Sequence, residues 1–215
     1  MPSSLPYVPS IKPSYAQHRN RLELEAKVKG MSCANLDIVV KDVGTNSPLF
    51  QAKGKYVFFA NGVDVKAAHG ALLYRVRQRR LSRRKVYKVT DGEVPKDGAS
   101  VLMQAQARRA LSDWTDLAIH CTSSSDNGGQ PRPSMLKIRT SHDTIEVLTD
   151  NGLVLGQIIR SKSALIRLSS AQSYRMLISP GVDASLVVLV FVCMHMQRLV
   201  RKSTMSTVAV TAAAA

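Results

Sequence analysis

Aromatic and acidic residues are both scarce in this sequence. Phe, Trp and Tyr make up 5% of the 215 residues, so aliphatic side chains must fill most of any core. Only 15 residues are Asp or Glu, against 30 Lys and Arg, which leaves a net charge of +15 and a pI of about 10.1. Such an excess attracts polyanions, namely nucleic acid, anionic lipid headgroups or acidic proteins, and it does not bear on the fold.

Cysteine is also scarce, and its pattern excludes two kinds of structure. Cys33, Cys121 and Cys193 are odd in number and widely spaced, with no CxxC pair. A disulfide framework and a structural zinc site are therefore not expected. Reduced thiols fit the cytosol or the nucleus. We therefore expect a cytoplasmic protein. Binding to anionic lipid would place it at the surface of a membrane, and binding to nucleic acid would place it in the nucleus.

Recognisable catalytic motifs are missing. The sequence contains no GxSxG, no HExxH, no P-loop and no dinucleotide-binding glycine pattern. Its five histidines are scattered singly, and the adjacent His120 and Cys121 would point to opposite faces of a strand. We therefore expect no enzymatic activity, no metal site and no cofactor.

Long apolar runs are missing as well, and the longest one predicts a buried helix. Leu186–Met194 contains nine successive apolar residues, whereas a bilayer span needs about 20, so no transmembrane span is expected. On a helix these nine residues cover every face, which indicates burial all round. Asp183 follows Pro180 and Gly181 and is placed to cap the first turn. The expected core residues of this helix are Leu186, Val187, Leu189, Val190, Phe191 and Met194.

What is present is a repeated hairpin. Val63–Arg77 aligns without gaps with Ile145–Ile159, so that Gly70 meets Gly152 at the turn. Each copy reads as an alternating strand, a turn with glycine and a second apolar strand. Looser hairpin patterns surround both copies. Serial hairpins of this kind predict an antiparallel meander that curls into a barrel.

Composition divides the chain into three parts. Residues 1–20 form a Pro-rich leader without an apolar signal region, expected to be disordered. Residues 21–202 carry the regular pattern and form one barrel domain. Residues 203–215 are a Ser/Thr/Ala tail, also expected to be disordered. The polar, Gly/Pro-rich segment Cys121–Ser134 is interpreted as an insertion between strands.

The order of these elements resembles a known family. Paired hairpins followed by YRMLISPGVDASLVVLVFV at 174–192 are similar to the LURP-one-related family of the tubby C-terminal-like fold, which also includes the phospholipid scramblases. The resemblance implies a closed twelve-stranded antiparallel barrel around a central hydrophobic C-terminal helix. It also implies a non-enzymatic scaffold. Tubby-like relatives bind phosphoinositides at membranes, and plant LURP-one relatives are linked to pathogen defence.

One segment of the chain is strongly basic. The window Ala71–Thr90 contains no acid. If 72–78 is a strand, Leu72, Tyr74 and Val76 face inward, and the arginines between them form an outer ridge. The candidate polyanion-binding residues of this basic ridge are Arg75, Arg77, Arg79, Arg80, Arg83, Arg84, Lys85 and Lys88.

Three interpretations of the basic ridge stay open. Arginine offers a planar fork that matches phosphate oxygens. The ridge therefore predicts binding of anionic phospholipid, such as phosphoinositide, in signalling or defence. The second interpretation is a nucleic-acid-associated regulator, and it is weaker because no DNA-binding motif and no aromatic stacking platform accompany the charge. The third is a solvated face without a ligand. The sequence does not indicate a protein partner.

Overall fold

The computed structural model describes residues 10–29, 35–55, 62–79, 86–94, 100–107, 117–122, 133–141, 143–161 and 172–213. Side chains are described within these ranges except at 55, 107, 117, 118, 122, 133 and 199–213.

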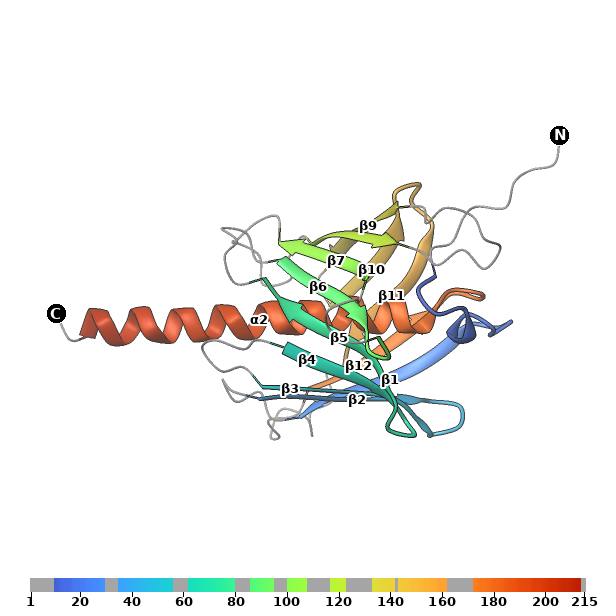
Figure 1. Cartoon of the computed structure of the whole chain (residues 1–215), viewed down its shortest axis with the longest axis horizontal. Helices are drawn as coiled ribbons and strands as arrows, with labels where there is room; N and C mark the ends of the chain where they lie inside the picture. Colours follow the sequence, from blue (N-terminus) through green and yellow to red (C-terminus); the bar gives the residue numbers. More distant parts are fainter. Residues whose placement is uncertain are drawn as a thin grey trace.

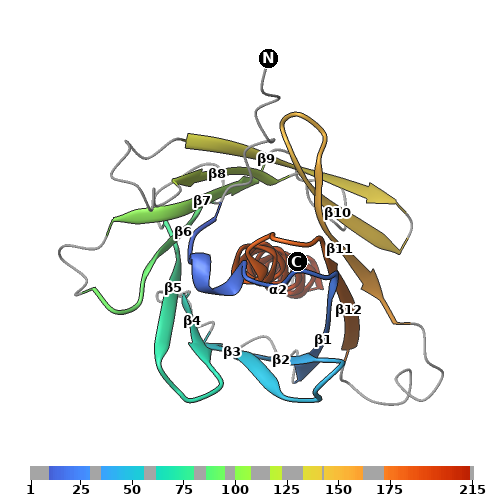
Figure 2. The ribbon, with the colours of Figure 1, turned by 90° about the vertical axis from the view of Figure 1, so that its right-hand side faces the viewer.

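Twelve antiparallel strands close into one barrel around a long helix (Figures 1 and 2). Each strand pairs with its neighbours in sequence, and β1 pairs with β12 to close the ring. The predicted fold class is confirmed. The strands are β1 Leu22–Lys29, β2 Asn35–Asp42, β3 Pro48–Lys55, β4 Gly62–Ala67, β5 Leu72–Gln78, β6 Val86–Asp91, β7 Val101–Ala107, β8 Leu117–Thr122, β9 Pro133–Ser141, β10 Thr144–Thr149, β11 Val154–Arg160 and β12 Gln172–Ile178.

The repeated hairpin appears as the pairs β4–β5 and β10–β11. Gly70 and Gly152 both have positive φ, +91° and +84°, which only glycine adopts without strain. The two turns also share hydrogen bonds at aligned positions, since the turn glycine donates to Ala67 in one and Thr149 in the other. Both pairs shift register directly after the aligned residues Val65 and Val147. The sequence repeat is therefore also a structural repeat, and the register shift, a β-bulge, occurs at the same position in both copies.

The helix α2, Ala184–Ala213, begins inside the barrel and leaves it at the far side (Figure 1). Every residue from Val182 to Gln197 is buried, and Arg198 is the first that is half-exposed. The six predicted core residues are all buried. The helix continues past Lys202, into the segment that we assigned to the tail.

Strand direction gives the barrel two distinct ends. At the exit end, where α2 leaves, odd-numbered strands finish and even-numbered strands begin. At the opposite end a short 3-10 helix, η1 Pro13–Tyr15, lies near the start of α2 (Figure 2). We call this the η1 end, and we call residues 10–20 the strap. The strap is part of residues 1–20, the segment that we assigned to the leader from the sequence. The division of the chain into leader, domain and tail stays a prediction.

Asp183 ties the strap to the helix. Its Oδ2 accepts hydrogen bonds from the backbone N–H groups of Ile11 and Lys12, both at 2.7 Å. Its Oδ1 accepts from the N–H and the hydroxyl of Ser185, at 2.8 and 2.6 Å, which is the predicted helix cap. The hydroxyl oxygens of Ser185 and Tyr74 are 2.7 Å apart. This buried network fixes the start of α2 against both β5 and the strap.

A charge inside the barrel should prevent folding. Val190 is fully buried on α2, and Val190→Asp would lose about 1.5–3 kcal/mol of apolar burial and add an unpaired buried charge that costs several kcal/mol more. Because a domain has only about 5–15 kcal/mol of stability, we expect an unfolded protein by circular dichroism. Val190→Ile is the matched control. A cooperative melt at the parent temperature for Val190→Asp would contradict the central position of α2.

Removing the Asp183 carboxylate should loosen the η1 end. Asp183→Ala loses the cap of α2, worth about 0.5–2 kcal/mol, and leaves buried donors unpaired at about 1–3 kcal/mol each. We expect the free energy of unfolding in urea to fall by about 3 kcal/mol or more. Asp183→Asn keeps one acceptor oxygen and should lose less. An alanine variant as stable as the parent would show that the network contributes nothing.

Candidate functional site

The basic ridge lies on the outer wall of the barrel, on β5 and β6. Tyr74 and Val76 are buried inward, while Arg75, Arg77 and Lys88 alternate with inward residues and are not buried. This orientation is the predicted one. The exception is the start of β5, where Leu73 is buried and Leu72 is half-buried. The register shift between β4 and β5 skips Leu73 in the pairing and so changes the alternation there.

Two arginines of the basic ridge make contacts within the protein. The Arg77 guanidinium donates to Asp64 Oδ1 at 2.7 Å and to the carbonyls of Val63 and Val76 at 3.2 and 3.1 Å. The Arg77 side chain crosses β4 at Gly62, where an added Cβ would lie 2.6 Å from Arg77 Cδ. Arg75 donates to the carbonyl of Val94 at 2.8 Å. These guanidinium groups are therefore partly committed to holding β4, β5 and the turn after β6.

Asp64 is the partner that the sequence window missed. It lies on β4, outside the acid-free stretch, and reaches Arg77 from the neighbouring strand. Among the described residues, three members of the basic ridge have no carboxylate partner: Arg75, which donates to backbone carbonyls instead, Arg79 and Lys88. Arg79 is exposed. The other four members, Arg80, Arg83, Arg84 and Lys85, lie outside the described residues.

Two grooves on the outer wall carry carboxylates. One, of about 400 Å³, is lined by Asp37 and Asp64 together with Lys53 and Arg77. The other, of about 470 Å³, is lined by Glu23, Glu25, Lys41, Asp42 and Arg175, among others. Because carboxylates match or outnumber the cations in both, neither groove favours an anionic headgroup. These two grooves are therefore not candidate anion sites.

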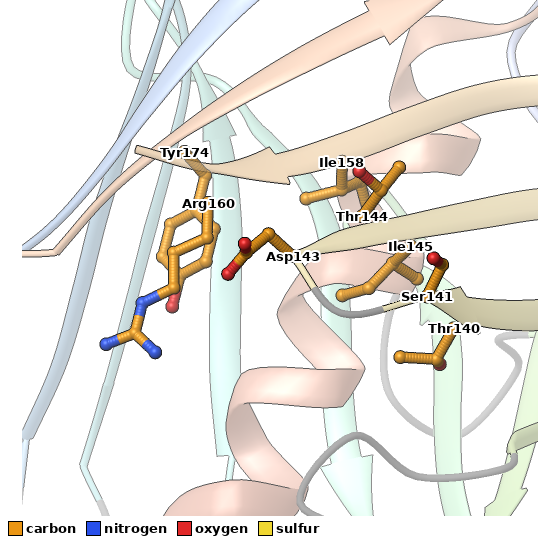
Figure 3. A pocket seen from close by; sticks show the side chains of 8 residues that line it. All are labelled: Thr140, Ser141, Asp143, Thr144, Ile145, Ile158, Arg160 and Tyr174. Atoms are coloured by element: carbon orange, nitrogen blue, oxygen red, sulfur yellow. The ribbon is translucent and has the colours of Figure 1, made fainter. Parts of the chain in front are cut away.

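A third hollow lies at the exit end (Figure 3). It is formed where β9 and β10 meet β11 and β12, and it does not hold the space of one water molecule. Figure 3 shows Arg160 and Tyr174 together at one side of it, and Thr140 and Ser141 at the other. Arg160, the last residue of β11, is exposed. The hollow itself is too small for a ligand. It is relevant to the surface of the exit end because it carries the exposed guanidinium of Arg160.

His195 is buried within this end of the barrel. Its ring packs edge-on against Tyr174 and Phe191, with centroids 5.1 and 4.4 Å away. Neither ring nitrogen has a hydrogen-bond partner in the described structure. Burial, with Arg198 and Arg160 nearby, lowers the pKa of His195 to about 3. The imidazole is therefore neutral and sealed from substrate, as expected for a core histidine.

The cysteines that the structure describes are inert. Cys121 and Cys193 are buried and free, and burial raises the pKa of each thiol to about 12. A thiol with such a pKa has almost no reactive thiolate at neutral pH. His120 is exposed on the outer face of β8 while Cys121 points inward, so the two cannot form a joint site, as predicted. In the described ranges no three His, Cys, Asp or Glu side chains gather as metal ligands would.

These features place the protein in the class of antiparallel β-barrels built around a central helix, with its polar groups on the wall and at the two ends. Residues 22–195 match the model of the LURP-one-related family. The chain belongs to this family, and the resemblance noted in the sequence is confirmed. The family match does not by itself assign a ligand.

A solved structure of another protein shares the fold. It is the X-ray structure of a protein from Arabidopsis thaliana, 13% identical, with a TM-score of 0.58. The likeness covers 86% of this chain and 95% of that one. A comparison with the curated proteins found no significant match. Within the part of the chain that the structure describes, no helix combines the length and the apolar character needed to cross a bilayer.

The two arginines at the end of β5 should differ in their effect on stability. Arg77→Glu would lose the ion pair and the carbonyl contacts and would place a carboxylate beside Asp64. An exposed pair contributes only about 0–1 kcal/mol, so with the added repulsion we expect a loss of about 1–2 kcal/mol in urea unfolding. Arg79→Glu should stay within about 0.5 kcal/mol of the parent. Equal losses in both variants would argue against a structural role for Arg77.

Proposed function

We propose that this LURP-one-related protein is a non-catalytic binding protein that recognises anionic phospholipid headgroups through the basic ridge. The observation that carries the proposal is an exposed cationic surface next to carboxylate-bearing grooves. Arg79 and Lys88 are at the surface without an acidic partner in the described residues, whereas the neighbouring Arg77 is neutralised by Asp64.

Burial supports a binding role rather than a catalytic one. The lumen is filled by α2, and burial holds His195, two tyrosines and the two described thiols in their neutral forms. Burial lowers the pKa of His195 and raises the pKa of Tyr74, Tyr174 and both described thiols. None of these five groups is poised near neutral pH for acid–base chemistry. Recognition by surface charge is the activity that these residues support.

A membrane fits the ridge better than nucleic acid does. Single-strand binders stack bases on exposed aromatic rings. Tyr74 and Tyr87, the tyrosines on β5 and β6, are both fully buried. Phosphate recognition by cations alone does not need such rings, and a leaflet presents phosphate to a peripheral protein at the bilayer surface. A role in signalling or defence is proposed by resemblance to relatives, and a cytoplasmic location is proposed from the pattern of cysteines. No protein partner is proposed.

Reversing the free cations of the basic ridge should abolish lipid binding. Each basic residue near an anionic leaflet contributes about 1 kcal/mol, so Arg79→Glu with Lys88→Glu should weaken binding to phosphatidylserine-containing vesicles by at least about thirtyfold. Added salt should weaken binding of the parent as well. The measurement is vesicle flotation at physiological salt, beside a gel-shift assay with DNA and RNA. The control is Arg19→Glu with Lys66→Glu, an equal charge change at exposed sites of the η1 end.

The flotation and gel-shift results separate the three interpretations. Loss of vesicle binding in the ridge variant alone, with unchanged melting temperatures, supports lipid recognition. A parent that shifts nucleic acid and ignores vesicles would replace this proposal with the regulator. A parent that binds neither would make the basic ridge a solvated face.

A further inference from the structure

The two ends of the barrel differ in charge. In sequence, the connections between strands at the exit end hold nine Lys and Arg against three Asp. Those at the η1 end, together with the segment from Ser179 to Asp183, hold two Lys and Arg against five Asp and Glu. The strap adds Lys12 and Arg19 to the η1 end, and Arg21 follows it directly, which brings that end to neutrality. By sequence, the connections at the end where α2 leaves therefore carry a net charge of +6 (9 − 3), and those at the η1 end, with the strap and Arg21, carry none (5 − 5).

Three described cations stand at the exit end without an ion pair. Lys29 ends β1, Arg79 follows β5 and Arg160 ends β11, and all three are exposed. In the described part of the chain, none of them has a carboxylate partner. Among the described residues, carboxylates also lie at or near the rim: Asp37 faces Lys29 across the strand pair, with no ion pair between the two, and Asp143 precedes β10.

These cations surround the helix rather than cluster. β5 and β11 are six places apart in a ring of twelve strands and lie on opposite sides of α2 (Figure 2). Arg79 directly follows β5 and Arg160 ends β11, so the two cations are on opposite sides of the helix as well. With strands spaced about 4.8 Å apart and tilted by about 40°, the barrel is about 24 Å across. That is about three Debye lengths at physiological salt. The two guanidinium groups cannot act on one phosphate.

Charges spread around one end of a barrel fit an extended anionic surface. We propose that the exit end is the face directed toward an anionic membrane, with Lys29, Arg79 and Arg160 contacting separate headgroups around α2. The part of α2 that projects from this end, residues 198–213, would then enter the leaflet between these contacts. The inference rests on the proposed function and extends its site from the basic ridge, through Arg79, to the far side of the barrel. It also sets the orientation, with the strap and the η1 end directed away from the lipid.

The test reverses the two rim cations that do not belong to the basic ridge. Lys29→Glu with Arg160→Glu leaves all eight ridge residues in place and lowers the net charge from +15 to +11. We expect its partition onto vesicles of phosphatidylcholine and phosphatidylserine to fall at least about thirtyfold. The control Arg19→Glu with Lys66→Glu has the same net charge and should lose less than about threefold. Lys29→Gln with Arg160→Gln should lie between them, and melting temperatures verify that each variant is folded.

Each outcome has a distinct meaning. If the rim variant binds like the parent while the ridge variant does not, the inference fails and the proposed function stands. Equal losses in the rim and control variants would show dependence on net charge alone and would overturn the orientation. Competition by soluble inositol trisphosphate at matched ionic strength would indicate a single headgroup site and also overturn it. If the parent does not bind vesicles, the proposed function itself fails.

Discussion

The burial of a helix that is apolar on every face is the constraint on which this structure depends. Such a helix cannot lie on a sheet with one side in water. It needs a wall all round, and α2 is about 10–12 Å across with its side chains. An eight-stranded barrel is only wide enough for inward side chains. A ring of twelve strands, about 24 Å across, holds the helix and one layer of side chains around it.

The same constraint decides where polar groups are placed. Along the buried part of α2, hydrogen-bonding side chains occur near its two ends, where the lumen opens. At the η1 end, Asp183 and Ser185 are fully satisfied by the strap and by Tyr74. At the exit end, His195 has no partner among the described residues for either ring nitrogen, and an unpaired buried group costs about 1–3 kcal/mol. The start of α2, at the η1 end, is therefore held by more side-chain hydrogen bonds than the part of the helix near the exit end.

Local signals were sufficient to predict the barrel and the helix, because both depend on short repeating patterns. Glycines in two aligned turns indicated the hairpins, and nine apolar residues in succession indicated the buried helix. Contacts between segments distant in sequence left no such signal. The strap reaches Asp183 across 171 and 172 residues, and nothing in a polar, Pro-containing segment predicts that its backbone N–H groups will cap a distant carboxylate.

The surface charge shows a different limit of sequence reading. A contiguous window groups residues by position along the chain, whereas a meander places every second connection at the same end of the barrel. The acid-free window around β5 therefore included Arg77, which Asp64 neutralises from the next strand. It also omitted Lys29 and Arg160, which share the exit end with Arg79. A planar partner can contact only cations that lie at one level, and the strand ends of a closed barrel supply that level. The side wall curves away from a plane and bears carboxylates in its grooves, so the end face is the surface on which the positive charge of this protein can act together.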